Sequence, residues 1–165
     1  LKATLAPSMD IVVSSNFERL LFEAYERDGA AVAALLGCFQ SEPTALAEAP
    51  LERLRALFAS HSVDDATILE VIREAHHRTK EVLDPHTATG YRAAERARAD
   101  AETPMITLAT AHPAKFAEAV VKAGFPGVPL PPHMDDLLER EERYTVLPAE
   151  LAKVQAFVAE NRRQH

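Results

Sequence analysis

The stretch from Val82 to Gly124 constrains the fold most, because short apolar runs alternate there with helical patterns. An uninterrupted apolar run of strand length, such as PMITLA, is typical of a buried parallel strand. Strands and helices in alternation predict a β-α-β-α unit, with a parallel sheet and a right-handed crossover. The two strand candidates and the two helical patterns occupy residues 81–84, 87–99, 104–109 and 113–123.

Two strands do not make a stable parallel sheet by themselves, so further strands are expected from chain outside this sequence. The sequence also begins at Leu1 without an initiator methionine, which agrees with a processed chain or a piece of a longer one. Apolar residues at helical spacing predict additional helices on both sides of the unit. They are expected over residues 15–28, 30–40, 50–61, 62–80, 135–144 and 148–162.

The predicted fold class is therefore α/β, a mostly helical chain with one β-α-β-α unit. Three segments are expected along the chain. A helical segment would cover residues 1–80, the β-α-β-α unit residues 81–127, and a proline-rich linker with helices residues 128–165.

Composition excludes several classes of protein. Of the 165 residues, 47% are hydrophobic, which is too many for a disordered chain. The single cysteine, Cys38, rules out an internal disulfide scaffold, and no apolar run reaches the length of a membrane span. With 18 Lys and Arg against 25 Asp and Glu, the net charge of −7 opposes binding to nucleic acid or anionic lipid. No signal peptide is visible, so we expect a cytoplasmic protein without nucleic-acid or membrane partners.

A polar cluster, Ser14-Ser15-Asn16-Phe17-Glu18-Arg19, lies at the predicted start of the first helix. Ser15 and Glu18 have the spacing of a capping box. The free N–H groups of a helix start, the helix dipole and an arginine fork also suit an anion. The residues alone leave two interpretations open, a capped helix with a surface arginine and an anion-binding site.

Two loops follow the strand candidates and lead into helices: Asp84–Gly90 (DPHTATG) and Thr110–Pro113 (TAHP). Ligands of open α/β sheets bind beyond the carboxyl ends of the strands, so two such loops on adjacent strands would converge on one ligand. The alternative is that both loops are ordinary turns, with Thr87 or Thr89 as a helix cap.

Other candidate sites are weaker. Glu74 and His77 have a metal-ligand spacing known from helical bundles, but no second pair accompanies them, so no metal site is predicted. Cys38 lies in an apolar stretch and is expected in the core. The sequence contains no glycine-rich phosphate loop.

Three segments, in order, resemble the threonine synthase family of bacteria and fungi. The first is Ser8-Met9-Asp10-Ile11 followed by residues 14–23 (SSNFERLLFE). The second is Asp84–Ala88 (DPHTA), and the third is residues 109–116 (ATAHPAKF). Because the three segments are spread over a large part of the chain, the whole chain resembles the C-terminal portion of such an enzyme.

The resemblance implies a tryptophan-synthase-β type of fold, in which two three-layer αβα domains hold pyridoxal phosphate between them. It also implies conversion of O-phospho-L-homoserine and water to L-threonine and phosphate. The lysine that holds the cofactor as a Schiff base belongs to the N-terminal part of the family, and its motif is absent here. Lys115 does not match that motif, so no catalytic residue is assigned. The chain alone is expected to be inactive, with the N-terminal part of the same enzyme as its partner.

On matching positions, the resemblance places Thr110 beside the pyridine nitrogen of the cofactor, with Thr87 and His86 in the same pocket. His112 is either a pocket residue or a helix cap, and the position before Pro113 favours the cap.

The substrate phosphate is placed, by the same resemblance, at Ser15, Asn16 and Arg19, where the residues themselves allow an anion site. Two other functions stay open. One is a non-catalytic helical interaction module, and the other is a different pyridoxal-phosphate lyase of the same fold.

Overall fold

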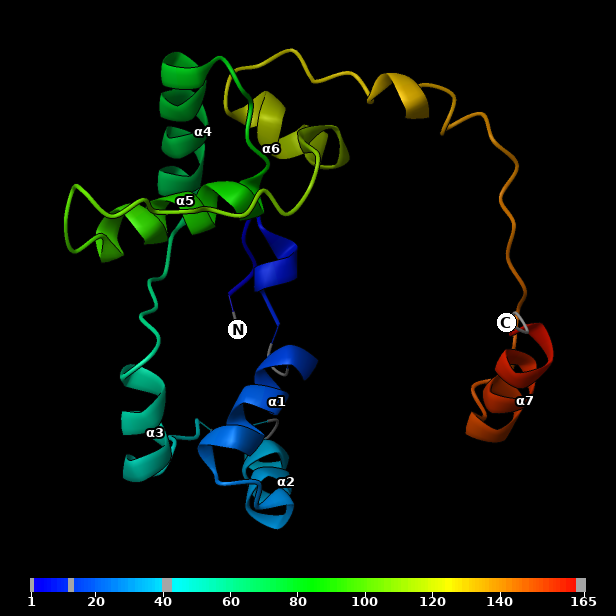
Figure 1. Ribbon diagram of the computed structural model, residues 1–165. Helices are drawn as coiled ribbons and strands as arrows, with labels where there is room; N and C mark the ends of the chain where they lie inside the picture. Colours follow the sequence, from blue (N-terminus) through cyan, green and yellow to red (C-terminus); the bar gives the residue numbers. More distant parts are fainter. Residues whose placement is uncertain (1, 12–13, 40–42, 163–165) are drawn as a thin grey trace. The chain divides into compact units, whose positions relative to one another are not determined.

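The computed structural model describes residues 2–11, 14–39 and 43–162, and in these ranges the chain is helical (Figure 1). Seven α-helices and three short 3₁₀ helices, labelled η, are described. In order they are η1 (Pro7–Met9), α1 (Ser15–Ala24), α2 (Gly29–Cys38), α3 (Glu48–Arg55), α4 (Asp65–Thr79), α5 (Pro85–Ala97), η2 (Pro113–Phe116), α6 (Ala117–Lys122), η3 (Pro132–Met134) and α7 (Leu151–Asn161).

The chain divides into two units, Leu1–Pro129 and Leu130–His165. In the second unit, helix α7 buries none of its side chains. None of the described helices is long and apolar enough to cross a membrane. The three-segment division expected from the sequence stays a prediction.

One buried cluster of the first unit joins α1, α2 and α3. Helix α1 contacts both of the others, and its Leu21 is fully buried. The other buried members of the cluster are Ala24, Val32, Leu35 and Leu54. The cluster therefore fixes the helix whose first turn carries the polar residues 14–19.

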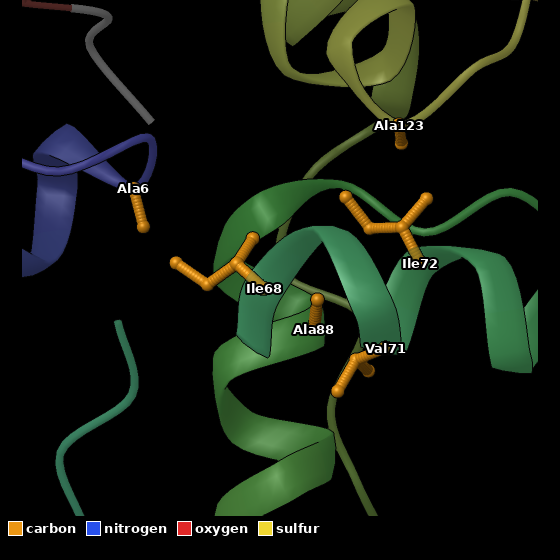
Figure 2. Close-up of a cluster of buried hydrophobic side chains, with 6 residues drawn as sticks. All are labelled: Ala6, Ile68, Val71, Ile72, Ala88 and Ala123. Carbon is orange, nitrogen blue, oxygen red and sulfur yellow. The ribbon is translucent and has the colours of Figure 1, made fainter. Parts of the chain in front are cut away.

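A second buried cluster joins α4, α5, α6 and the segment before η1 (Figure 2). Ile68, Val71 and Ile72 supply one face of α4, and all three are almost completely buried. Figure 2 shows Ala6 beside Ile68 and Ala123 beside Ile72. Each fully buried Val or Ile stabilises the fold by about 1.5–3 kcal/mol. The buried face of α4 therefore holds α5 and the segment before η1 in place by packing against them.

Aspartates begin three of the helices. Asp28 accepts hydrogen bonds from the backbone N–H groups of Ala30 and Ala31, and Asp64 accepts one from Thr67 at 2.9 Å. Hydrogen bonds from Thr67 lower the pKa of the exposed Asp64 carboxyl. Asp64 lies at the positive end of the dipole of α4, where a negative charge is stabilising. Asp84 begins α5 and is described below, because unlike the other two it is buried.

The predicted β-α-β-α unit is not confirmed, since residues 2–11, 14–39 and 43–162 contain no strand. Residues 81–84 lead into a helix cap, and residues 104–109 have no regular secondary structure. Ile106 and Leu108 are 81% and 75% exposed. A strand exists only where a neighbour pairs its N–H and C=O groups, and the described chain offers these residues no such neighbour.

The helix expected over residues 135–144 is wrong, because the segment forms turns around an Arg140–Asp136 ion pair. Its residues carry many charges and no apolar stripe to bury, and packing of such a stripe supplies most helix stability in proteins. The helix expected over 50–61 is shorter and earlier, as α3. The remaining expected helices are present, with boundaries shifted by a few residues.

Candidate functional site

Asp84 is the most buried charged residue of the described chain, with 1% of its surface exposed. It is the N-cap of α5, and Pro85 occupies the first helical turn. Its carboxylate accepts the backbone N–H of His86 at 2.9 Å and that of Thr87 at 3.4 Å. It also accepts the Thr87 hydroxyl and contacts Nδ1 of His86 at 2.9 Å. A buried carboxylate must be satisfied by such donors, so Asp84 is committed to organising this turn.

His86 has both ring nitrogens engaged. Nδ1 faces the Asp84 carboxylate, and Nε2 accepts the backbone N–H of Ser8 at 3.1 Å. The ring is buried, with 7% exposed, and it lies against Phe116 with centroids 4.4 Å apart. His86 therefore contacts all three of the segments singled out in the sequence.

Thr87 connects the second segment to the third. Its hydroxyl donates to Asp84 and accepts the backbone N–H of Thr110 at 3.1 Å. Thr110 is exposed, and its own hydroxyl has no hydrogen-bond partner within the described ranges. The backbone at Thr110 is thus held in place while its side chain stays available to a ligand.

A pocket of about 520 Å³ opens beside this arrangement. Asp84 and Thr87 line it, together with Ala109 and Ala111 on either side of Thr110, whereas Thr110 and His86 do not line it. His112 also lines it, and its Nδ1 accepts the N–H of Ala114 at 3.3 Å as the N-cap of η2. His112 is therefore both the cap of η2 and a lining residue of the pocket, so the two alternatives do not exclude each other.

The start of α1 differs from the expected capping box. The helix begins at Ser15 with Ser14 as its N-cap, and no side chain caps it. Because the cap lies one residue earlier than expected, Phe17 occupies the position that a capping-box glutamate needs. The first N–H groups of α1 therefore have no side-chain acceptor in the described structure, as an anion-binding helix start requires.

Arg19 is exposed and makes no ion pair within the described part of the chain. Ser15 and Arg19 line a pocket of about 650 Å³, whereas Asn16 does not. Glu18 and Glu23 also line it, but Glu23 is paired with Arg27 at 3.1 Å. Among the described residues, the pocket therefore has one cation without an ion pair, Arg19, and one carboxylate without an ion pair, Glu18, beside the start of α1.

The sequence predicted that the loops containing Thr87 and Thr110 lie close together. It did not predict that Asp84 and Ser8 hold His86 and Thr87 in place through hydrogen bonds. A signal for Asp84 was available, since aspartate followed by proline is a frequent way to begin a helix. Nothing in the sequence indicates the bond between Ser8 and His86, whose positions lie 78 residues apart.

The structure gives the weaker candidates other surroundings. Glu74 is paired with Arg92 at 2.8 Å. The expectation that Cys38 lies in the core is not confirmed, because Cys38 is half-buried and belongs to neither buried cluster. Within the described ranges, no group of three or more His, Cys, Asp or Glu side chains is arranged to hold a metal ion.

Comparison with known proteins gives consistent matches. Residues 87–158 match the family model described as threonine synthase, C-terminal. The chain is 53% identical to the threonine synthase of Pseudomonas aeruginosa over 163 residues, which is 98% of this chain and 35% of that protein. It is 38% identical to the Saccharomyces cerevisiae threonine synthase over 138 residues, 73% of this chain and 27% of that protein.

A solved structure matches as well. The pyridoxal-phosphate-bound threonine synthase from Brucella melitensis is 41% identical, with a TM-score of 0.76 over 99% of this chain and 35% of that one. Almost the whole of this chain is matched in both proteins. The matched part makes up about a third of the length of each of them.

Proposed function

This chain belongs to the threonine synthase family, as its C-terminal region, and on that premise we propose that it forms part of a pyridoxal-phosphate-dependent lyase. The reaction is conversion of O-phospho-L-homoserine and water to L-threonine and phosphate. The relatives are threonine synthases, which favours this function over another lyase of the same fold and over a non-catalytic helical module.

The observation that carries the proposal is the contact between Thr87 and Thr110. These residues come from two separate segments, and the 3.1 Å bond between them holds the Thr110 backbone while leaving its hydroxyl exposed. A neutral hydroxyl that can donate or accept suits the ring nitrogen of a pyridine. Asp84, the nearby carboxylate, is already committed to four donors.

These residues fit pyridoxal phosphate, which when bound supplies an electron sink for carbanion chemistry. Thr110 would contact the ring nitrogen, and Thr87 would hold Thr110. Because the facing group is a neutral hydroxyl rather than a carboxylate, this chain would not force a proton onto the ring. We propose no contact between the cofactor and the His86 nitrogens, since Asp84 and Ser8 occupy both.

The start of α1 would bind the phosphate of the substrate. The unpaired N–H groups of its first turn and the uncommitted guanidinium of Arg19 are both suited to a phosphate dianion. Ser15 and Asn16 would add side-chain contacts. The same groups would hold the phosphate as it leaves, because its negative charge grows when the carbon–oxygen bond breaks.

The N-terminal part of the enzyme would supply the lysine that binds the cofactor. Lys115, whose Nζ lies 5.6 Å from the centre of the Phe116 ring, is not assigned that role. We propose that the enzyme works in the cytoplasm, as suits the biosynthesis of an amino acid. Because that lysine lies in the N-terminal part, this chain would be inactive without it.

A visible absorption spectrum tests the cofactor assignment. The protein in its natural length, purified with pyridoxal phosphate, should show an absorption band of bound cofactor that shifts when O-phospho-L-homoserine is added. A protein that binds neither cofactor nor substrate under these conditions would refute the proposal.

Replacing Thr110 tests the residue on which the proposal depends. Thr110→Val removes the hydroxyl at constant shape, and should shift the cofactor band and lower kcat, because the ring nitrogen loses its partner. Thr110→Ser keeps the hydroxyl and serves as the matched control. A Thr110→Val protein with the spectrum and kcat of wild type would show that Thr110 is only structural.

A further inference from the structure

We propose that His86 is a positioning residue: its neutral ring ties the segment before the phosphate-binding helix to the loop that carries Thr87. The proposal names a role for a residue that the family resemblance placed only in the cofactor pocket. Its consequence for substrate binding rests on the proposed function, whereas the tie itself does not.

The partners of the ring determine its tautomer. Asp84 is a carboxylate that accepts three other groups, so the Nδ1 contact at 2.9 Å requires a proton on Nδ1. The Ser8 group in contact with Nε2 is its backbone N–H, which can only donate, so the 3.1 Å contact requires a lone pair on Nε2. Both conditions hold for one form only, the neutral imidazole protonated at Nδ1.

The ring is held firmly in this orientation. It is 7% exposed, and Phe116 packs against it with the ring planes tilted by 57°. The Asp84 carboxylate is itself fixed by the first turn of α5. A buried acceptor on a rigid ring is therefore presented to the Ser8 N–H.

The segment that contains Ser8 is anchored on both sides of this bond. The Leu5 N–H donates to Asp65 at the start of α4 at 2.8 Å, and Ala6 is buried against Ile68 (Figure 2). The Asp10 carboxylate accepts the Thr4 N–H at 2.6 Å and closes the segment into a loop. Among the described residues, the Ser8–His86 bond is the hydrogen bond that joins this loop to α5.

The anchored loop limits where the phosphate-binding helix can begin. Ser15 follows Ser8 by seven residues, a length of chain that reaches about 25 Å at most. Through Asp84 and Thr87, the same cap that holds His86 also holds Thr110. His86 thus connects the segment leading to Arg19 with the proposed cofactor contact.

Two isosteric variants separate this role from simple packing. In His86→Asn the side-chain amide lies near the former Nδ1 and can satisfy Asp84, but it cannot reach Ser8. In His86→Gln the amide oxygen lies near the former Nε2 and can accept the Ser8 N–H. His77→Gln, at an exposed histidine of α4, is the matched control.

Hydrogen–deuterium exchange of residues 2–11 measures the tie directly in the protein of natural length. The Ser8 amide should lose protection in His86→Asn and keep it in His86→Gln and in His77→Gln. The KM for O-phospho-L-homoserine should rise roughly three- to tenfold in His86→Asn, the size of one lost hydrogen bond, with a smaller rise in His86→Gln. The kcat should change less than KM.

The ¹⁵N spectrum of the wild-type histidines gives a reading that does not depend on any variant folding. It should show a protonated Nδ1 and a bare Nε2 for His86 at neutral pH. The opposite tautomer, or equal exchange in the Asn and Gln variants, would overturn the proposal. If exchange follows the prediction while the wild-type protein makes no threonine, the tie holds and the proposed function fails.

Discussion

Replacing Asp84 with Ala should destabilise the protein by about 2–4 kcal/mol. Loss of the N-cap of α5 costs about 1 kcal/mol, and up to 2 in favourable cases. The Thr87 hydroxyl and His86 Nδ1 would then be buried donors without an acceptor, at a further cost of about 1–3 kcal/mol. The free energy of unfolding, measured in denaturant on the protein of natural length, gives the result.

Asp28→Ala is the matched control for this measurement. Asp28 also caps a helix, accepting the N–H groups of Ala30 and Ala31, but it is exposed. Its replacement should cost only about 1 kcal/mol, as is usual for a cap in contact with water. Equal losses in the two variants would mean that the buried donors around Asp84 contribute nothing beyond capping. Asp84→Asn should fall between wild type and Asp84→Ala, because its carbonyl oxygen still caps the helix.

Replacing Arg19 with Ala should raise the KM for O-phospho-L-homoserine by about ten- to a hundredfold. A hydrogen bond to a charged group contributes about 1.5–3 kcal/mol, and each 1.4 kcal/mol is a factor of ten in binding. Arg19 has no competing ion pair in the described structure, so its full charge is available to the phosphate. Steady-state kinetics over a range of substrate concentrations measures the change.

Two further variants define what Arg19 contributes. Arg19→Lys keeps the charge but loses the planar fork, so its KM should lie between wild type and Arg19→Ala. Arg78→Ala removes an exposed arginine of α4 that is paired with Glu95 and does not line this pocket, and should leave KM within about twofold, since an exposed ion pair is worth little. A KM for Arg19→Ala equal to that of Arg78→Ala would contradict the phosphate role.

Helices were the predictable part of this fold. The buried faces of α1 and α4 follow from apolar residues spaced three and four apart, and Leu21, Ile68 and Ile72 are buried as that spacing requires. The starts of helices were less predictable. One residue separates the actual cap of α1, Ser14, from the capping box that the sequence suggests.

Strands could not be predicted in the same way, because a strand depends on a partner. The apolar run at residues 104–109 has the composition of a buried strand, yet the described chain leaves Ile106 and Leu108 exposed and unpaired. If the N-terminal part of the enzyme supplies neighbouring strands, as the family resemblance implies, this run is where they would pair. The local composition indicated a tendency to form a strand. No strand forms because no described residues pair with the backbone of this run.

The candidate site was predictable in its segments and not in its connections. Thr87 and Thr110 were expected near one another because both follow strand candidates, and a bond of 3.1 Å joins them. The role of His86 depends on contacts with Ser8 and Phe116. Contacts between such distant positions depend on how the helices pack against one another. The spacing of residues along the sequence does not predict that packing.

Product analysis tests the central claim most directly. The protein in its natural length, supplied with pyridoxal phosphate and O-phospho-L-homoserine, should release threonine and inorganic phosphate in equal amounts. The rate at low substrate concentration should fall in Arg19→Ala and in Thr110→Val, and should stay close to that of wild type in Arg78→Ala. Absence of threonine from wild-type protein that has bound the cofactor would contradict the account.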